Sequence, residues 1–418
     1  MVQAVHARLD AHFGADHALA VDHARAQTVT PIRDIRLDVY ESLPAVEREW
    51  RAFEAHADGT VFQRFDWLAT WHSHIGVRSG VSPAIVVGRD SDGTIQFLIP
   101  LALRTFDFAR VLTWLGSDLC DYNAPLLAPS FGERIGRERF LAAWHDLTLR
   151  LQENSRLRFD YVNLTKMPET VGAQKNPMLH LAVTKNASGA YLTHLAGDWE
   201  TFYSAKRSSS TRRRDRTKRK RLGELGEVRF VNPESDADVL HTLDTLMRQK
   251  TKSFARMGVA NLFARPGYAD FYRALAVGAA TKHLVHLSSL NVGATTAATN
   301  LGLTDRGRYY HLLASYDDGE VSRFGPGAAH LHDLLHLAID RGYGIFDFTI
   351  GDEPYKRDWC DTELTLYDFV AVATWRGALV AAPMIAKQRL KRWIKQTPVL
   401  WKVFSAGRAL LGSLKPKQ

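Results

Sequence analysis

The 418-residue sequence predicts an α/β protein of the α+β type, built from two similar lobes. Segments with helical periodicity are interspersed with short runs rich in β-branched and aromatic residues. One order of elements also occurs twice along the chain: helices, an antiparallel meander, a long helix and a strand. A chain of this length exceeds what one hydrophobic core usually supports. We therefore expect a duplicated domain with mixed central sheets flanked by helices.

The chain divides into five expected regions. The first thirty residues carry charged residues and histidines throughout and lack the apolar core of a signal peptide, so we expect a loose tail there. The regions are a flexible N-terminal tail at 1–33, a first lobe at 34–195, a basic helical connector at 196–226, a second lobe at 227–375 that carries the chemistry, and basic amphipathic C-terminal helices at 376–418.

The first copy begins with an alternating strand and a helix from Ser42 to Ala55, for which Ser42 is the expected N-cap. Phe62-Gln-Arg-Phe-Asp-Trp-Leu opens a second helix whose aromatic residues share one face. Ser91-Asp92-Gly93 predicts a hairpin turn. The other expected elements are strands at 34–40, 84–89, 95–103, 111–115 and 158–164 and a helix at 132–151.

The second copy repeats this order and ends on a strand, Phe346-Asp347-Phe348, that resembles Phe159-Asp160-Tyr161 of the first copy. Chance similarity of one tripeptide is the alternative, but the matching element order favours duplication. The expected elements are helices at 236–253, 268–280 and 328–341 and strands at 283–290, 296–303, 309–315 and 345–350.

The net charge of +9 is concentrated in two patches. Lys206 to Arg221 contains ten basic residues and one acidic residue, and Phe369 to Gln418 contains ten basic residues and no acidic one. The rest of the chain is acidic. Each patch suits an anionic partner, such as nucleotide phosphates, RNA, acidic polysaccharide or a lipid surface.

Several site classes are not expected. Cys120 and Cys360 are the only cysteines, so the sequence predicts neither a disulfide framework nor a zinc pattern. His332 and His336 share one helix face without a third ligand, and we expect no metal. Arg376 interrupts the longest apolar run, so a spanning helix is not expected.

The stretch from Gly344 to Trp359 is the most informative. Gly351 and Pro354 bracket a turn directly after a buried apolar strand, at the strand end where open α/β sheets bind ligands. An ordinary polar loop with a salt bridge is the alternative interpretation. The turn brings together four candidate catalytic side chains: Asp352, Glu353, Tyr355 and Lys356.

The connector, Thr201 to Gly226, predicts a basic helix that begins near Ser210 and ends at Gly223 or Gly226. Such a helix is either a solvated face or an anion-binding element. If the helix binds an anion, its guanidinium and ammonium groups bind a phosphate or an acidic acceptor at the cleft between the lobes. The residues concerned are Lys206, Arg207 and Arg212.

Four motifs carry a resemblance to a known family: Phe62-Gln-x4-Leu-x2-Trp, the helix end Leu225-Gly-Glu-Val-Arg-Phe, Phe324-Gly-Pro-Gly-Ala, and Gly351-Asp-Glu-Pro-Tyr-Lys-Arg-Asp-Trp. Over 34–369 the chain resembles the tandem GNAT-superfamily acetyltransferases of the CelD type, which are associated with cellulose biosynthesis. It is also similar to the Fem-type peptidyltransferases. The resemblance implies two GNAT-like lobes, with an acyl-CoA donor and an acceptor meeting between them.

The resemblance places the CoA pyrophosphate on the turn Ser322 to Ala328, at the start of a helix, where free amides and the helix dipole favour anions. The family has Arg or Gln where this chain has Ser322, and Pro326 lacks an N–H group. Arg323 is the neighbouring cation. The implied acetyl-CoA ligands are Arg323, Gly325, Gly327 and Ala328.

Acyl transfer requires a base for the acceptor proton and a donor at the developing oxyanion. We expect Lys356 to counter the anion, Tyr355 to donate to the leaving thiolate, and Asp352 or Glu353 to orient or deprotonate the acceptor. Asp317 is a second base candidate, with turn formation as its alternative. The expected acceptor-site residues are Phe62, Gln63, Asp121, Tyr122, Lys206, Arg207, Arg212, Tyr316 and Trp359.

The expected function is therefore acyl transfer from acyl-CoA to an amine or hydroxyl, on a polysaccharide or cell-envelope precursor, in the cytoplasm or at the inner face of the membrane. A Fem-like aminoacyl transferase that uses charged tRNA is one alternative. A non-catalytic accessory module of an exopolysaccharide synthesis system is another. The basic tail around Ile385, Leu390 and Trp393 either lies on an anionic membrane or a polysaccharide synthase, or packs on the domain.

Overall fold

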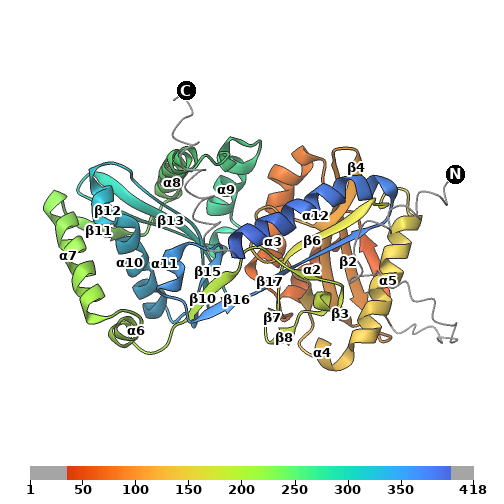
Figure 1. Cartoon of the computed structure of the whole chain (residues 1–418). Helices are drawn as coiled ribbons and strands as arrows, with labels where there is room; N and C mark the ends of the chain where they lie inside the picture. Colours follow the sequence, from red (N-terminus) through yellow and green to blue (C-terminus); the bar gives the residue numbers. More distant parts are fainter. Residues whose placement is uncertain (1–34, 397–418) are drawn as a thin grey trace. The chain divides into compact units, whose positions relative to one another are not determined.

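The computed structural model describes residues 35–396, with side chains through Leu390 (Figure 1). The expected N-terminal tail, and the expected C-terminal helices beyond residue 396, lie outside these residues. Two large mixed sheets lie side by side, each flanked by helices. The predicted fold class is confirmed.

The first sheet is eight-stranded and the second seven-stranded, and a short hairpin is separate from both. The first contains β1 (Arg36–Tyr40), β2 (Ser82–Arg89), β3 (Ile95–Phe106), β4 (Ala109–Trp114), β5 (Leu126–Leu127), β6 (Tyr161–Pro168), β9 (Thr184–Lys185) and β17 (Leu366–Val372). The second contains β10 (Ala190–His194), β11 (Val228–Val231), β12 (Val285–Val292), β13 (Thr295–Asp305), β14 (Arg308–Tyr316), β15 (Ile345–Ile350) and β16 (Thr362–Leu364). The hairpin is β7 (Thr170–Val171) and β8 (Gln174–Lys175).

The helices follow the order predicted for each lobe, with α6 and α7 between the two copies. They are α2 (Leu43–Glu54), α3 (Phe65–Trp71), α4 (Phe131–Arg134), α5 (Arg137–Glu153), α6 (Trp199–Lys206), α7 (Ser209–Leu225), α8 (Asp236–Arg256), α9 (Tyr268–Val277), α10 (Pro326–Asp340), α11 (Pro354–Arg357) and α12 (Trp375–Gln396). A π-helical turn follows α3 at His72–Gly76, and 3-10 turns lie at Val61–Gln63, Val77–Ser79, Pro177–His180, Leu262–Ala264, Lys282–Leu284 and Glu320–Phe324.

The duplication is confirmed by strand order. The first sheet runs β1-β2-β3-β4-β6-β17-β9 and the second β11-β12-β13-β14-β15-β10-β16. In each sheet the fourth strand pairs in parallel with the fifth over three residue pairs. Val111 pairs with Tyr161 at the start of one parallel pairing, and Arg308 pairs with Ile345 at the start of the other.

This register corrects the tripeptide match. Counting from these first pairs, the counterpart of Phe346-Asp347-Phe348 is Val162-Asn163-Leu164. Asp160 instead lies before β6, where its carboxylate accepts a 2.8 Å hydrogen bond from the amide of Arg110 and one of 2.6 Å from Thr374. The Phe-Asp similarity is therefore three residues out of register.

The two copies exchange strands in a way that local sequence does not reveal. Strand β10 follows the first copy but pairs with β15 of the second sheet, and β17 follows the second copy but pairs with β6 of the first. Both pairings are antiparallel. Each sheet is thus completed by a strand that lies outside its own copy in the chain: β10 precedes the second copy, and β17 follows both copies.

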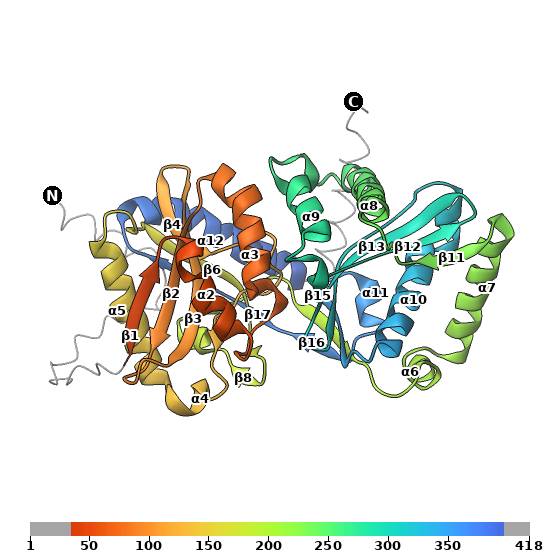
Figure 2. The same cartoon turned by 180° about the vertical axis from the view of Figure 1, so that it is seen from behind.

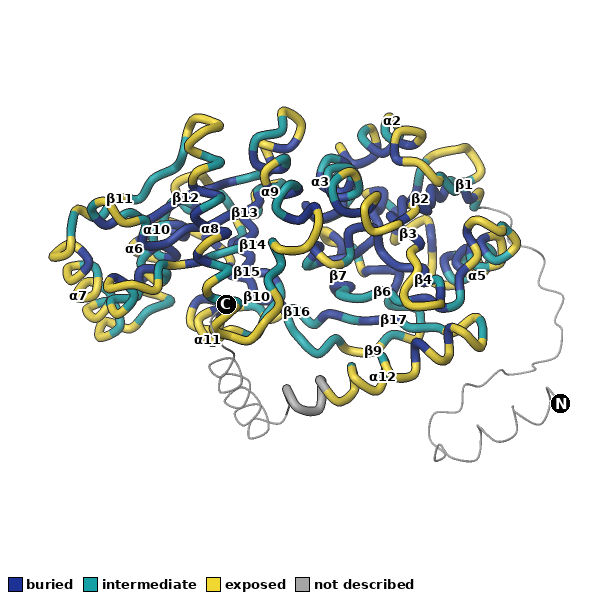
Figure 3. Tube along the Cα trace, turned by 90° about the horizontal axis from the view of Figure 1, so that it is seen from above, coloured by how far each residue is buried: buried dark blue, intermediate teal, exposed yellow. Residues whose placement is uncertain are grey.

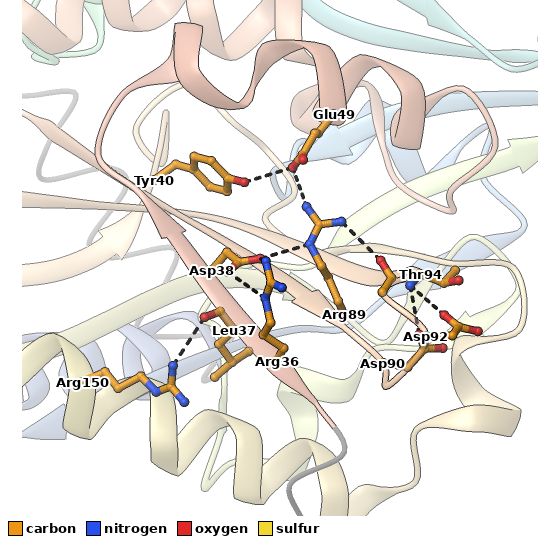
Figure 4. Close-up of polar contacts among 11 residues, drawn as sticks. Arg36, Leu37, Asp38, Tyr40, Glu49, Arg89, Asp90, Asp92, Thr94 and Arg150 are labelled. Carbon is orange, nitrogen blue, oxygen red and sulfur yellow. Dashed lines mark hydrogen bonds and ion pairs between the residues drawn. The ribbon is translucent and has the colours of Figure 1, made fainter.

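Local chemistry explains several element boundaries. The hydroxyl of Ser235 caps α8 by accepting from the amide of Asp238, and Ser208 caps α7 by accepting from Thr211. The predicted turn between β2 and β3 is present, with Gly93 in the left-handed region at φ 89°. At the edge of the first sheet, Arg89 on β2 pairs with Asp38 on β1 and Glu49 on α2 (Figure 4).

The lobes contact each other through both apolar and charged side chains. Helices α3 and α9 lie next to each other where the lobes meet (Figure 2). Trp67 of α3 meets Phe271 of α9 edge to face, with 5.1 Å between ring centroids. Arg64 forms a bidentate ion pair with Asp305, whose side chain is largely buried. The guanidinium of Arg306 donates to carbonyls at the end of α2. These contacts hold the facing surfaces of the lobes in one arrangement.

Candidate active site

Strands β14 and β15 separate at their carboxyl ends. Their parallel pairing ends at Tyr310 and Asp347, although β14 continues to Tyr316 and β15 to Ile350. Beyond the last pair, the facing edges of the two strands lose their ladder partners. Buried backbone carbonyls require hydrogen-bond donors, so other groups must supply them there.

Two lysine ammonium groups supply these donors. Nζ of Lys250, on α8, donates to the carbonyl of Ala314 on β14 at 3.0 Å. Nζ of Lys356, on α11, donates to the carbonyl of Ile350 on β15 at 2.9 Å. Lys356 is only 4% exposed, and burial lowers the pKa of Lys250. One buried and one half-buried cation therefore border the opening between the strands.

The turn after β15 is shaped to bring Lys356 close to the backbone. Thr349 has φ 58°, an unfavourable conformation for a β-branched residue. Gly351 has φ 132°, and a side chain there would lie 2.4 Å from the Glu353 carboxylate and 2.9 Å from Nζ of Lys356. Lys356 and Glu353 form an ion pair of 3.0 Å. The Gly351 position therefore requires glycine.

Asp347 is completely buried on the side of β15 that faces the first lobe. Its Oδ1 accepts from the Tyr122 hydroxyl at 2.7 Å and from the Thr349 amide at 2.8 Å, and its Oδ2 lies 3.4 Å from the Arg308 guanidinium. Burial raises the pKa of Asp347, an effect that Arg308 opposes.

Asp121, beside Tyr122 in the same first-lobe loop, adds a second carboxylate. It is half-buried, and the Thr349 side chain favours its ionised form. Burial raises the pKa of Asp121, while the charges of Lys166 and Lys356 lower it. Nζ of Lys166 donates to the carbonyl of Cys120 at 2.5 Å. The cluster is thus built from both lobes.

The structure brings Lys356, Glu353, Asp121 and Tyr122 together as one polar cluster. Tyr355 packs edge-on against Phe348, with 6.4 Å between ring centroids, and keeps part of its surface exposed. Asp352 lies in the same turn. The four predicted catalytic candidates of this turn therefore lie near one another, and their catalytic roles stay predictions.

Phe62 and Gln63 are buried behind the loop that carries Tyr122. The amide of Gln63 donates to the Tyr122 carbonyl at 2.9 Å, and the ring of Phe62 packs edge to face on the Tyr122 ring. Asp317 forms the turn weighed as its alternative role, since its carboxylate accepts from the Gly319 amide at 2.8 Å. Tyr316 is exposed next to Gly327.

Sequence reasoning missed Lys250, Lys166, Arg308 and the role of Asp347. For Asp347 the sequence did contain a signal. It is a charged residue inside the apolar run Ile-Phe-Asp-Phe-Thr-Ile, and a buried carboxylate requires hydrogen-bond or ionic partners from elsewhere in the fold. Lys250 had no signal, since it reads as an ordinary lysine in a basic stretch of α8.

A cavity of about 240 Å³ lies at the N-terminus of α10. It combines a helix start, basic side chains of α7 and aromatic rings of α6. It is lined by Trp199, Glu200, Tyr203, Arg207, Arg212, Asp215, Arg216, Lys218, Arg219, Gly325, Ala328, Ala329, His332 and Trp359. Trp199 and Tyr203 stack at 5.0 Å between centroids, and the Arg207 guanidinium lies 4.8 Å above the Trp359 ring.

Two buried nitrogen atoms of this cavity, Nε of Arg207 and Nε of Arg212, lack a hydrogen-bond partner in the part of the chain that the structure describes. Nδ1 of His332 lies 3.5 Å from the Asp333 carboxylate. Buried donors without partners are rare, so this cavity favours an anionic ligand. Of the other predicted anion contacts, Arg323 pairs with Glu320 at 2.6 Å and Lys206 with Asp361 at 3.0 Å.

A second cavity, of about 350 Å³, lies between the lobes. Tyr122, Arg308 and Tyr310 line it, so it reaches the residues that bind Asp347. Its rim adds carboxylates, a hydroxyl and histidine from both lobes: Asp58, Thr60, Glu169 and His194.

The second part of the chain matches a protein-family model. Residues 209–357 match the model of the acetyltransferase (GNAT) domain. The matched stretch runs from α7 to α11 and contains Lys250, Asp347 and Lys356. A search of curated proteins found no match.

Two solved structures share the fold at low sequence identity. FemX aligns with a TM-score of 0.53 and 10% identity, covering 79% of this chain and 96% of FemX. A conserved protein of unknown function from Bacteroides thetaiotaomicron aligns with a TM-score of 0.52 and 11% identity, covering 81% and 100% of the two chains. A tandem GNAT protein from the clavulanic acid biosynthesis pathway aligns with a TM-score of 0.44 and 10% identity, covering 81% and 98%.

Two expected absences concern metals and membranes. Within residues 35–396, no cluster of three or more His, Cys, Asp or Glu side chains is arranged to hold a metal ion. No helix in that same range combines the length and apolar character needed to cross a bilayer.

Proposed function

We propose that this protein transfers an acetyl or other acyl group from acyl-CoA to an amine or hydroxyl acceptor. The observation that carries the proposal is the opening between β14 and β15, bordered by the ammonium groups of Lys250 and Lys356 within a stretch that matches the acetyltransferase (GNAT) domain. Acyl-CoA supplies the activated thioester. The acceptor forms a bond to the acyl carbon, the C–S bond breaks, and CoA leaves as a thiol after its sulfur receives the proton lost by the acceptor.

The two ammonium groups provide positive charge where a carbonyl oxygen becomes negative during attack. They are held by backbone carbonyls before the reaction, so little reorganisation is needed. Of the two lysines, Lys356 interacts with the acidic residues of the cluster. It forms an ion pair with Glu353, and its charge lowers the pKa of Asp121. We assign Lys356 to the oxyanion and Lys250 to its support.

Asp121 is the proposed base. The carboxylate takes the proton from the attacking amine or hydroxyl, and its raised pKa makes it a stronger base than an exposed carboxylate. It acts only when ionised, so activity should fall as pH drops through its raised pKa.

The cavity at the start of α10 fits the phosphates of the donor. Pro326 lacks an N–H group, and the amides of Ala328 and Ala329 already donate to Gly325, so the backbone offers fewer donors than a typical anion-binding turn. The guanidinium groups of Arg207 and Arg212 compensate, with their unpartnered Nε atoms.

We further propose that the acceptor lies in the cavity between the lobes and is a saccharide or cell-envelope precursor. Tyrosine, arginine and carboxylate side chains line this cavity, which suits a polyhydroxylated ligand. The CelD-type resemblance supports the same acceptor class.

Donor binding tests the proposal directly. Acetyl-CoA or CoA should raise the melting temperature of the wild type, and Arg212→Ala should reduce the shift. Lys356→Met should bind CoA normally but lose turnover on the order of a hundredfold. If no acyl-CoA stabilises the protein, the accessory-module alternative gains support and the enzyme proposal fails.

A charged tRNA donor is the second candidate. The outward face of α7 is basic and exposed through Arg213, Arg214 and Lys220, which suits a phosphate backbone. A tRNA complex whose affinity falls steeply with salt, together with no effect of CoA, would favour this Fem-like alternative.

A further inference from the structure

Helix α12 packs one side firmly on the first sheet. Val380 and Ala381 are buried against Ala109 and Val111 of β4 and Tyr161 of β6. A side chain at position 377 would lie 2.0 Å from the carbonyl of Asp160, so Gly377 permits the close approach. This packing fixes which side of α12 faces outward.

The outward side of α12 is also apolar. Trp375 is 70% exposed, Leu379 59% and Leu390 53%. The exposed residues between them, Ala382, Pro383 and Ala386, continue this stripe at helical spacing. Figure 3 shows exposed positions along α12. Surface helices normally present polar side chains to water, so a second apolar stripe indicates an unpartnered contact surface.

The β3–β4 hairpin extends this surface beyond the start of α12. Phe106 is 48% exposed and Phe108 56% exposed, on either side of the turn residue Asp107. Phe106 pairs with Ala109, which packs in the same cluster as Val380 of α12. The two phenylalanines therefore lie beside the helix, at the end of the sheet where α12 begins.

The charges on this surface are nearly all positive. The guanidinium of Arg376 lies 5.6 Å from the Trp375 ring and that of Arg104 lies 5.9 Å from the Phe106 ring. Lys387 and Arg389 are exposed farther along the helix. The α12 sequence contains no acidic residue, and Asp107 at the hairpin tip is the acid of this surface.

We propose that the outer face of α12 and the β3–β4 hairpin form one interfacial surface that docks on an anionic lipid bilayer. Aromatic and aliphatic side chains enter the headgroup region, and the flanking arginines and lysines contact lipid phosphates. A protein partner would require acidic groups opposite the same cations. The sequence beyond residue 396 also contains no acidic residue, so its charge too is complementary to an anionic surface. The inference is independent of the proposed acyl transfer.

Vesicle flotation of the full chain tests this surface. The wild type should float with vesicles of phosphatidylglycerol mixed into phosphatidylcholine, and should stay in solution with pure phosphatidylcholine or at 0.5 M salt. Two double variants, Trp375→Ser/Leu379→Ser and Phe106→Ser/Phe108→Ser, should each lose at least fivefold of the bound fraction. Val77→Ser is the matched control, because Val77 is 62% exposed on another part of the first lobe.

Circular dichroism and melting temperature verify that the variants remain folded, as expected for exposed sites. Equal flotation of both double variants and the wild type overturns the proposal. Equal binding of the wild type to vesicles with and without phosphatidylglycerol also overturns the proposal. A dimer in sedimentation that both double variants abolish, without vesicle binding, assigns the face to contact between two copies and overturns the lipid assignment.

Discussion

The hydroxyl of Tyr122 donates a 2.7 Å hydrogen bond to Oδ1 of Asp347, across 225 positions of sequence. Both groups are buried, and the bond joins a first-lobe loop to a second-lobe strand. Because Asp121 precedes Tyr122, this bond also determines where the proposed base lies relative to Lys356. The arrangement of the lobes and the chemistry of the site are therefore linked.

Tyr122→Phe should destabilise the protein by about 1–3 kcal/mol, because Asp347 loses a buried donor while keeping those from Thr349 and Arg308. Urea unfolding measures the change. Tyr367→Phe is the control, since its 2.7 Å bond to Glu169 is exposed and should contribute less than about 1 kcal/mol. Equal losses for both variants would contradict the importance assigned to the buried bond.

Lys250→Met should lower kcat by roughly tenfold to a hundredfold with little change in the KM for acyl-CoA, because its ammonium borders the opening between β14 and β15. Steady-state kinetics provide the measurement. Lys252→Met is the matched control, because Lys252 lies two residues away on the same helix, is exposed and pairs with Asp318. A comparable loss in the control would show that general charge, rather than position, matters.

Acid should destabilise the protein through three buried histidines. Burial lowers the pKa of His286 and His311 to about 3 and that of His330 to about 4, from an ordinary value of 6.5. A lowered folded-state pKa means that the stability is present above pH 6.5 and is lost as pH falls toward the folded value. For His330 the loss is about 3 kcal/mol.

Urea unfolding at pH 7, 6, 5 and 4 checks this dependence. His330→Gln keeps a hydrogen-bonding group near Ser288, its 3.0 Å partner, but removes the titration. Its stability should therefore decline less steeply than that of the wild type. Parallel curves for the two proteins would show that His330 does not contribute.

A chain that ends at residue 365 should lose the folded first lobe, because it lacks β17 and α12. Strand β17 pairs with β6, and Asp368 accepts a hydrogen bond of 3.0 Å from the Lys166 amide. Limited proteolysis should then cut residues 35–168 much faster than in the full chain. A chain ending at residue 396 keeps both elements and should resist as the full chain does. Equal protection of the shorter chain would mean that the exchanged strand is dispensable.

Local patterns predicted most of the elements. The hairpin at Ser91-Asp92-Gly93, the strands of both meanders and the basic helix follow from turn residues, alternation and capping, which act over a few residues. The predicted helix at 132–151 is present as α4 and α5, divided at Ile135 and Gly136. The polar turn after β15 placed Lys356 and Glu353 at the strand end, where the structure has them.

The partners of those residues were not predictable in the same way. Lys250 donates to β14 only because α8 crosses that strand, and nothing in its neighbouring residues encodes the crossing. Likewise, Phe159-Asp160-Tyr161 suggested the duplication correctly but in the wrong register, since strand register depends on pairing with distant strands.

By itself the sequence determined the two-lobe α/β class, the repeated order of elements, the basic helix and the polar turn after β15, because periodicity, capping and turn chemistry are local. The tertiary structure alone decided the exchange of β10 and β17, the bond between Tyr122 and Asp347, and the outward apolar face of α12. Those features depend on which distant surfaces meet, because a buried polar group such as the Asp347 carboxylate is stable only where distant partners supply its hydrogen bonds.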